Sequence, residues 1–135
     1  MSLADSNAII RKHLADDAGL VALVGGRIYC PRLPEGATLP AVGFFTRGGR
    51  SSPYIPDMPS PSVQFDCWAD NPIEAREVYR ALYDALQGIQ NTTVTIDGTD
   101  YYILSAREEV QGIDLVDVEV PNYFRVLTYF EIMVR

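Results

Sequence analysis

The chain has 135 residues, of which 47% are apolar and 21% are charged, so we expect one globular domain spanning residues 1–135. This composition excludes a disordered chain and a collagen-like fibre. It also excludes a membrane span, because no stretch approaches the roughly 20 consecutive apolar residues that a spanning helix needs. The formal net charge of −7 disfavours the wrapping of nucleic acid, since phosphate contacts reward clustered positive charge.

Two short helices are predicted near the N-terminus. The first has a capping side chain at position 5 or 6 and runs to about Ala15. The second has a cap at position 16 or 17 and ends before Gly25-Gly26, because glycine commonly follows a helix C-terminus. The three prolines in residues 27–40 favour an extended chain, with at most a short strand over 27–30.

Two strands are predicted in the middle of the chain, over residues 41–46 and 62–69. In the second, Val63, Phe65 and Cys67 recur with the period of two that places them on one face. Residues 47–61 contain four prolines, so we expect no regular element there. The sequence therefore predicts a hairpin whose long irregular loop exceeds an ordinary connection, and such loops are commonly functional.

The clearest helix begins at residues 71–74, with the sequence Asn-Pro-Ile-Glu. An asparagine cap, proline at the first helical position and glutamate at the third are all typical of a helix start. The apolar residues after it recur at helical spacing: Ala75, Val78, Tyr79, Leu82 and Leu86. The opposite face is polar and Gly88 ends the pattern, so we expect this helix to cover a sheet with one side.

The last third of the chain is predicted to be mainly strand. A strand over 91–97 turns at Asp97-Gly98, the preferred pair for a type I′ hairpin, and returns over 99 to about 107. The acidic stretch 108–121 is expected to be irregular, and 122–135 to form the longest strand. The predicted fold is therefore α+β: a mainly antiparallel sheet of about five strands, with the long helix and the N-terminal helical pieces packed on one face.

The sequence contains no recognisable catalytic or metal-binding pattern. The one histidine, His13, lies on the apolar stripe of the first helix, where packing is a commoner role than catalysis. Cys30 and Cys67 have no nearby zinc ligands and are expected to act as small hydrophobic residues. The acids between 108 and 119 lack the spacing of a calcium loop. We therefore expect no enzymatic activity, no cofactor and no metal, and interpret the chain as an interaction protein.

Three segments carry a resemblance to a known family: Leu20–Tyr29 (LVALVGGRIY) with the prolines that follow, Val63–Leu86 (VQFDCWADNPIEAREVYRALYDAL), and the long strand Tyr123–Val134. Their order resembles that of phage tail-completion proteins, which are similar to the tail terminators of long-tailed phages. The resemblance implies a structural protein of the virion, in the tail–neck region, assembled in the host cytoplasm. It implies a ring, usually of six copies, that caps the tail tube, ends its polymerisation and presents the surface joining head and tail.

The resemblance also implies partners: further copies of the chain, the major tail-tube protein, and head-completion or connector proteins. DNA would pass through the ring without specific binding, and no membrane is involved. A ring of identical subunits needs two different patches that meet, and a basic loop beside an acidic segment suits such contact. The residues predicted for this interface are Arg47, Arg50, Tyr54, Ile55, Met58, Glu108, Glu109, Asp114, Asp117 and Glu119.

Two alternatives remain open at this level. The first is another neck component, such as a head-closure or connector protein, which would contact the portal side. The second is a small ligand-binding or enzymatic α+β domain that uses a cleft between the long loops.

Overall fold

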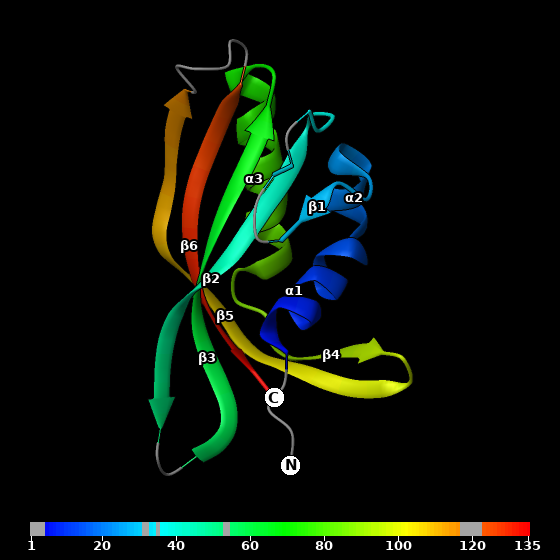
Figure 1. Cartoon of the computed structure of the whole chain (residues 1–135), viewed down its shortest axis with the longest axis vertical. Coiled ribbons are helices and arrows are strands. Elements are labelled where there is room, and N and C mark those ends of the chain that lie inside the picture. Colours follow the sequence, from blue (N-terminus) through cyan, green and yellow to red (C-terminus); the bar gives the residue numbers. More distant parts are fainter. Residues whose placement is uncertain (1–4, 31–32, 35, 53–54, 117–122) are drawn as a thin grey trace.

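The computed structural model describes residues 5–30, 33–34, 36–52, 55–116 and 123–135. The helices and strands of this part are α1 (Ser6–Ala15), α2 (Ala18–Val24), β1 (Ile28–Tyr29), β2 (Ala41–Ser52), β3 (Ile55–Ala69), α3 (Pro72–Leu86), β4 (Gln90–Ile96), β5 (Thr99–Val116) and β6 (Phe124–Val134). The strands form one sheet in the order β1-β2-β3-β6-β5-β4, with only β1 and β2 parallel. Figure 1 shows the helices on one side of this curled sheet, which confirms the predicted α+β class. No described helix is long and apolar enough to cross a membrane.

The helix ends follow the capping chemistry of the sequence. Asp5 accepts hydrogen bonds from the backbone of α1, and Asp17 accepts one from the first turn of α2. Asn71 accepts from the backbone N–H of Glu74 at the start of α3. Such caps satisfy backbone donors that have no partner inside the helix. The predicted starts of all three helices are confirmed.

The expectation of an irregular loop over residues 47–61 is wrong. Residues 47–52 and 55–61 continue β2 and β3 as a paired hairpin, with pairs such as Gly49↔Pro61 and Arg50↔Ser60 and with register shifts in β2; residues 53 and 54 lie outside the described residues. Proline is tolerated there because β3 pairs with β6 only from Ser62 onward, and a proline on an edge removes no hydrogen bond to a further strand. We refer to residues 47–61 as the arm; in Figure 1 it extends beyond the body of the sheet.

The expectation of an irregular segment from residue 108 is also wrong as far as Val116. Strand β5 continues to that residue and pairs with β6 throughout, but three register shifts interrupt the ladder, after Ile103, Glu108 and Val110. Each shift inserts an extra residue and so reverses the face to which the following side chains point. The period of two is therefore lost in the sequence although the strand persists.

The core lies between the concave face of the sheet and the helices. The alternating residues of β3 and β6 point into it, as predicted, and α3 covers them with its apolar stripe. Three aromatic rings form its centre: Phe65 stacks on Phe44 and meets Phe130 edge to face. The polar flank of α3 stays exposed, so this helix presents one face to solvent along its whole length.

Candidate partner-binding surfaces

A hydrogen-bond network joins α3 to the bulged part of β5. The hydroxyl of Tyr79 donates to Glu108 Oε2 at 2.6 Å and accepts from the backbone N–H of Gly112 at 3.2 Å. Thr128 of β6 also lies in hydrogen-bond contact with the same carboxylate oxygen, at 2.8 Å. Burial and the bond to Glu108 raise the pKa of Tyr79 to about 12. Glu108 is thus half-buried, and its carboxylate is held by side chains of α3 and β6.

Gly112 permits this close approach. A Cβ atom at this position would lie 2.7 Å from Val126 Cγ1 and 2.9 Å from Tyr79 Cζ. Those distances are shorter than van der Waals contact, so any side chain would push β5 away from α3.

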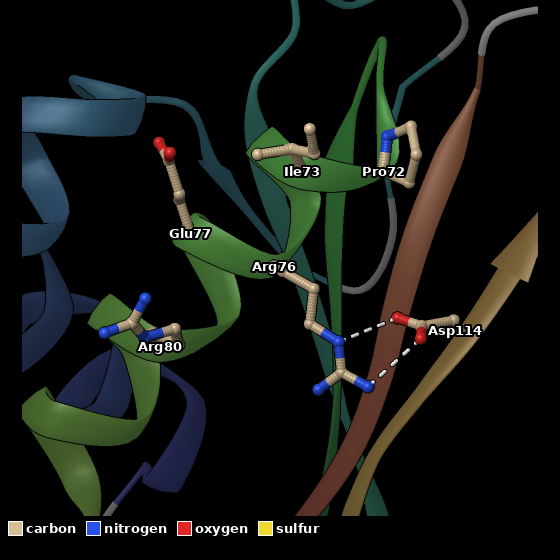
Figure 2. Close-up of a pocket in the computed structure, with 6 residues that line it drawn as sticks. All are labelled: Pro72, Ile73, Arg76, Glu77, Arg80 and Asp114. Atoms are coloured by element: carbon tan, nitrogen blue, oxygen red, sulfur yellow. Dashed lines mark hydrogen bonds and ion pairs between the residues drawn. The ribbon is translucent and has the colours of Figure 1, made fainter.

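A second contact between α3 and β5 lies one helical turn closer to the start of the helix. Arg76 forms an ion pair with Asp114 of β5, Nε to Oδ1 at 2.9 Å, and its Nη2 donates to the Gly112 carbonyl at 3.2 Å. Figure 2 shows this side chain reaching from the helix to the strand. Both partners are partly exposed, so the contact orients the strand more than it stabilises the fold.

An open hollow of about 410 Å³ lies beside the Arg76–Asp114 ion pair. Its lining residues are Pro72, Ile73, Arg76, Glu77, Arg80 and Asp114. Ile73 is 74% exposed, the highest fraction among the exposed large hydrophobic side chains of the described residues. Among the described residues Arg80 forms no ion pair. The hollow therefore combines an exposed apolar side chain with an unpaired cation (Figure 2).

The convex face of the sheet carries stacked cations. At the base of the arm, the Arg47 guanidinium lies 4.3 Å from the centre of the Tyr129 ring. Arg125 lies over Trp68 and is 3.4 Å from Asp66 Oδ1. Burial raises the pKa of Asp66 even though Arg125 acts to lower it. No described acid forms an ion pair with Arg47.

The structure separates the ten residues predicted for an interface into three groups. Glu108, Glu109 and Asp114 contact their own subunit, and Glu109 accepts a hydrogen bond from Ser62 at 2.8 Å. Arg47 and the backbone positions of three others lie in the arm: Arg50, Ile55 and Met58. The remaining three lie outside the described residues: Tyr54, Asp117 and Glu119.

His13 and the two cysteines occupy unlike environments. The Nε2 of His13 lies 2.9 Å from the Ala85 carbonyl, to which it donates, and so caps the end of α3. Cys67 is buried and its pKa is raised by burial, whereas Cys30 is exposed. Within the described ranges no three histidine, cysteine or acidic side chains gather closely enough to hold a metal ion.

The contributions of Arg76 and Tyr79 were not predicted from the sequence. Both lie on α3, where Tyr79 was assigned to the apolar stripe on spacing alone. One signal in the sequence was available, a glycine within an otherwise acidic stretch, which is typical of a close backbone approach.

Comparisons with known proteins agree on the kind of protein. The model of the family described as "Tail completion protein gp17" matches residues 8–109. A chain of the solved structure "Virion of native gene transfer agent (GTA) particle" has the same fold, with a TM-score of 0.66 and 18% identity, over 96% of this chain and 93% of that one. No curated protein matches the sequence.

Proposed function

This chain belongs to the tail completion protein gp17 family and is a structural protein of the virion tail, and we propose that it caps the tail tube as a homo-oligomeric ring, with six copies as the expected number. The ring ends tube polymerisation and offers the surface on which the head is joined. The family match over residues 8–109 carries this proposal. The shared fold with a chain of a gene transfer agent virion supports it across nearly the whole length.

The surfaces of the subunit suit a head-to-tail ring. Such a ring needs two unlike patches on each copy. The arm carries the exposed cation Arg47 on β2, and the exposed carboxylates Glu109 and Asp114 lie on β5, three strands further along the sheet. We propose that the arm, with Arg47, Arg50, Tyr54, Ile55 and Met58, docks on a neighbouring copy or on the tube.

The remaining partners follow from this position in the tail. The lower end of the ring contacts the major tail-tube protein, and the upper end contacts head-completion or connector proteins. The net charge of −7 suits a passage through which DNA moves without being held, because phosphate groups bind to clustered cations.

The test is an assembly assay with tubes of the major tail-tube protein, observed by electron microscopy, together with light scattering of the protein alone. We expect tubes to stop growing and to carry a ring at one end. Tubes that elongate as before, with the protein bound instead to a portal-containing head, would identify the protein as a different neck component.

The arm is tested separately by shortening it between Gly49 and Pro61. Folding is measured by circular dichroism and thermal melting, and assembly by the assay above. We expect a folded protein that no longer forms rings or caps tubes. A shortened protein that folds, forms rings and caps tubes as well as the parent would exclude the arm from the interface.

A further inference from the structure

The convex face of the sheet is not covered by any described helix, because α1, α2 and α3 all lie on the other side (Figure 1). The strand register shows which side chains lie on the convex face. Val63, Phe65 and Cys67 of β3 are buried in the core, so the residues between them point to the convex face. Their cross-strand partners point the same way, since paired residues of antiparallel strands share a face.

Three rows of cross-strand partners form the centre of this face and run over β2, β3, β6 and β5. The rows are Phe45–Gln64–Tyr129–Val110, Gly43–Asp66–Leu127–Ile113 and Ala41–Trp68–Arg125–Leu115. Most of these side chains are large and apolar or aromatic, and two on β5 are strongly exposed, Val110 at 41% and Ile113 at 43%. An antiparallel sheet face that is turned to water carries polar side chains instead, so this face has the composition of a covered one.

Arginine side chains lie over the aromatic rings of the convex face. The guanidinium of Arg47 is 4.3 Å from the centre of the Tyr129 ring, and that of Arg125 is 5.3 Å from the centre of the Trp68 ring. Aromatic residues and arginine are enriched in the cores of protein interfaces, and tyrosine, tryptophan and arginine commonly supply most of the binding energy there. The convex face therefore resembles a surface that binds protein.

The ion pairs on this face present their arginines outward. In the Arg107–Glu131 pair the arginine side chain is 69% exposed and the glutamate 26%. In the Arg125–Asp66 pair the fractions are 35% and 13%. Together with the exposed Arg47, these side chains give the face guanidinium groups on the outside and carboxylates beneath them. A partner with free carboxylates and some apolar surface would be complementary to it.

The opposite side of the subunit offers such a surface on the exposed flank of α3. Exposed residues at helical spacing form one stripe, which we call the α3 stripe: Ile73, Glu77, Arg80, Asp84 and Gln87. Neither of its two carboxylates forms an ion pair with a described residue. The stripe begins with Ile73, which is 74% exposed, so it combines free acids with an apolar anchor.

We propose that the convex face of one copy packs against the α3 stripe of the next copy, and that this packing is the ring contact. The inference rests on the ring proposed above. The two surfaces are unlike patches on opposite sides of one subunit, as a head-to-tail ring requires. In the ring, each sheet has helices on both faces, its own on the concave side and its neighbour's on the convex side, which is a common stable layer arrangement.

Hydroxyl-radical footprinting of the unmodified protein tests the contact, because the rate at which an aromatic side chain is labelled follows its exposure to water. The free subunit is compared with the assembled ring. We expect Trp68 and Tyr129 of the convex face, and Tyr83 beside the α3 stripe, to be labelled at least about threefold more slowly in the ring, since interface cores exclude water. Tyr102, which is 40% exposed on the β4–β5 hairpin, is the control and keeps its rate.

The outcomes separate this contact from the ring itself. A protein that remains monomeric both alone and on tubes overturns the ring and the contact together. A ring in which Trp68 and Tyr129 are labelled as fast as in the free subunit overturns the contact alone. Protection of these two residues without protection of Tyr83, whether in the ring, on tubes or with added duplex DNA, also overturns it, because another molecule would then occupy the convex face.

Two charge-reversal variants provide the second measurement. Arg47→Glu changes the convex face, and Glu77→Arg with Asp84→Arg changes the α3 stripe; none of these residues forms an ion pair with a described residue. We expect each variant alone to fold and to assemble at least about tenfold more weakly than the parent, because like charges then face each other. Thermal melting measures folding, and light scattering measures assembly.

An equimolar mixture of the two variants should assemble again. In a ring where they alternate, the acidic convex face of one variant meets the basic stripe of the other, and every remaining contact joins two unchanged surfaces. Arg135→Glu is the matched control, because it changes the net charge as Arg47→Glu does but at an exposed residue outside both surfaces, and it should assemble like the parent. A mixture that assembles no better than either variant alone, or a variant that assembles like Arg135→Glu, would contradict the proposed contact.

Discussion

Replacement of Tyr79 by phenylalanine tests whether α3 holds the bulged part of β5 in place. The hydroxyl donates to the Glu108 carboxylate at 2.6 Å and accepts from the Gly112 N–H at 3.2 Å. A hydrogen bond to a charged group contributes about 1.5–3 kcal/mol, and a backbone donor left without a partner adds to the loss. We therefore expect Tyr79→Phe to lower the free energy of unfolding at pH 7 by about 2–3 kcal/mol, within the range for such bonds.

The same residue predicts a pH dependence. The folded-state pKa of Tyr79 is raised from 10.0 to about 12, so the unfolded chain loses its proton first as pH rises. The contribution of Tyr79 is complete below about pH 10 and is lost as pH rises through about 12. At pH 11 the difference in stability between the parent and Tyr79→Phe should be smaller than at pH 7 by about 1 kcal/mol.

Urea denaturation of both proteins at pH 7, 9 and 11 measures these differences. Tyr83→Phe is the matched control, since Tyr83 is 36% exposed and its hydroxyl bonds to no described residue. It should leave the free energy of unfolding within about 0.5 kcal/mol of the parent. Equal stability of Tyr79→Phe and the parent at pH 7, or a difference that does not shrink by pH 11, would refute the assigned network.

Leu82 is fully buried, so Leu82→Ala should lower the free energy of unfolding by about 2–5 kcal/mol. Arg80→Ala, on the exposed face of α3, should change it by under about 0.5 kcal/mol. Chemical denaturation of both variants and the parent measures these differences. Gly112→Ala places a Cβ 2.7 Å from a valine methyl, and thermal melting should reveal a loss of about 1–3 kcal/mol. A thiol reagent should label Cys30 in the native protein but Cys67 only on unfolding, because Cys67 is buried; fast labelling of both would contradict its burial.

Local patterns in the sequence predict the elements whose chemistry is local. Asn71 and the apolar stripe of α3 identify that helix because the cap and the spacing are both contained within it. The period of two identifies β3 from Ser62 onward and β6, since each lies between paired strands with one buried face. The Asp97-Gly98 turn has positive φ at both residues, as its sequence predicts.

The wrong predictions for residues 47–61 and for the stretch from residue 108 to Val116 share a physical origin, and because these stretches are strand, β2, β3 and β5 are all longer than β6, which was expected to be the longest strand. The arm lies at an edge, where a strand pairs on one side only and proline removes no second bond, so proline density is a poor indicator against strand there. In β5 the bulges reverse the alternation three times, so a continuous strand lacks the pattern by which strands are recognised. In both stretches tertiary pairing overrides the local signal.

The acidic stretch that begins at residue 108 shows that the direction of side chains on a candidate surface also depends on tertiary pairing. Composition alone indicates a charged, partner-facing stretch, but Glu108 points inward, where Tyr79 and Thr128 bind it. Its direction is set by the bulge that precedes it, between Ile103 and Ser105, and a bulge depends on the register with β6. Charge is therefore readable from the sequence, whereas the direction of a charged side chain on a bulged strand is not.

Both the sequence and the folded structure are needed to recognise which strand edges are closed. The proline-blocked edge of the arm can be read from the sequence once β3 is known to include residues 55–61. The edge of β5 that α3 closes is visible only in the folded structure. There Gly88, just after α3, bonds to β5, and Tyr79 of α3 binds the N–H of Gly112. The two edges are thus closed by unrelated means, one by prolines and one by a helix and its side chains, and only the first of these means is visible in the sequence.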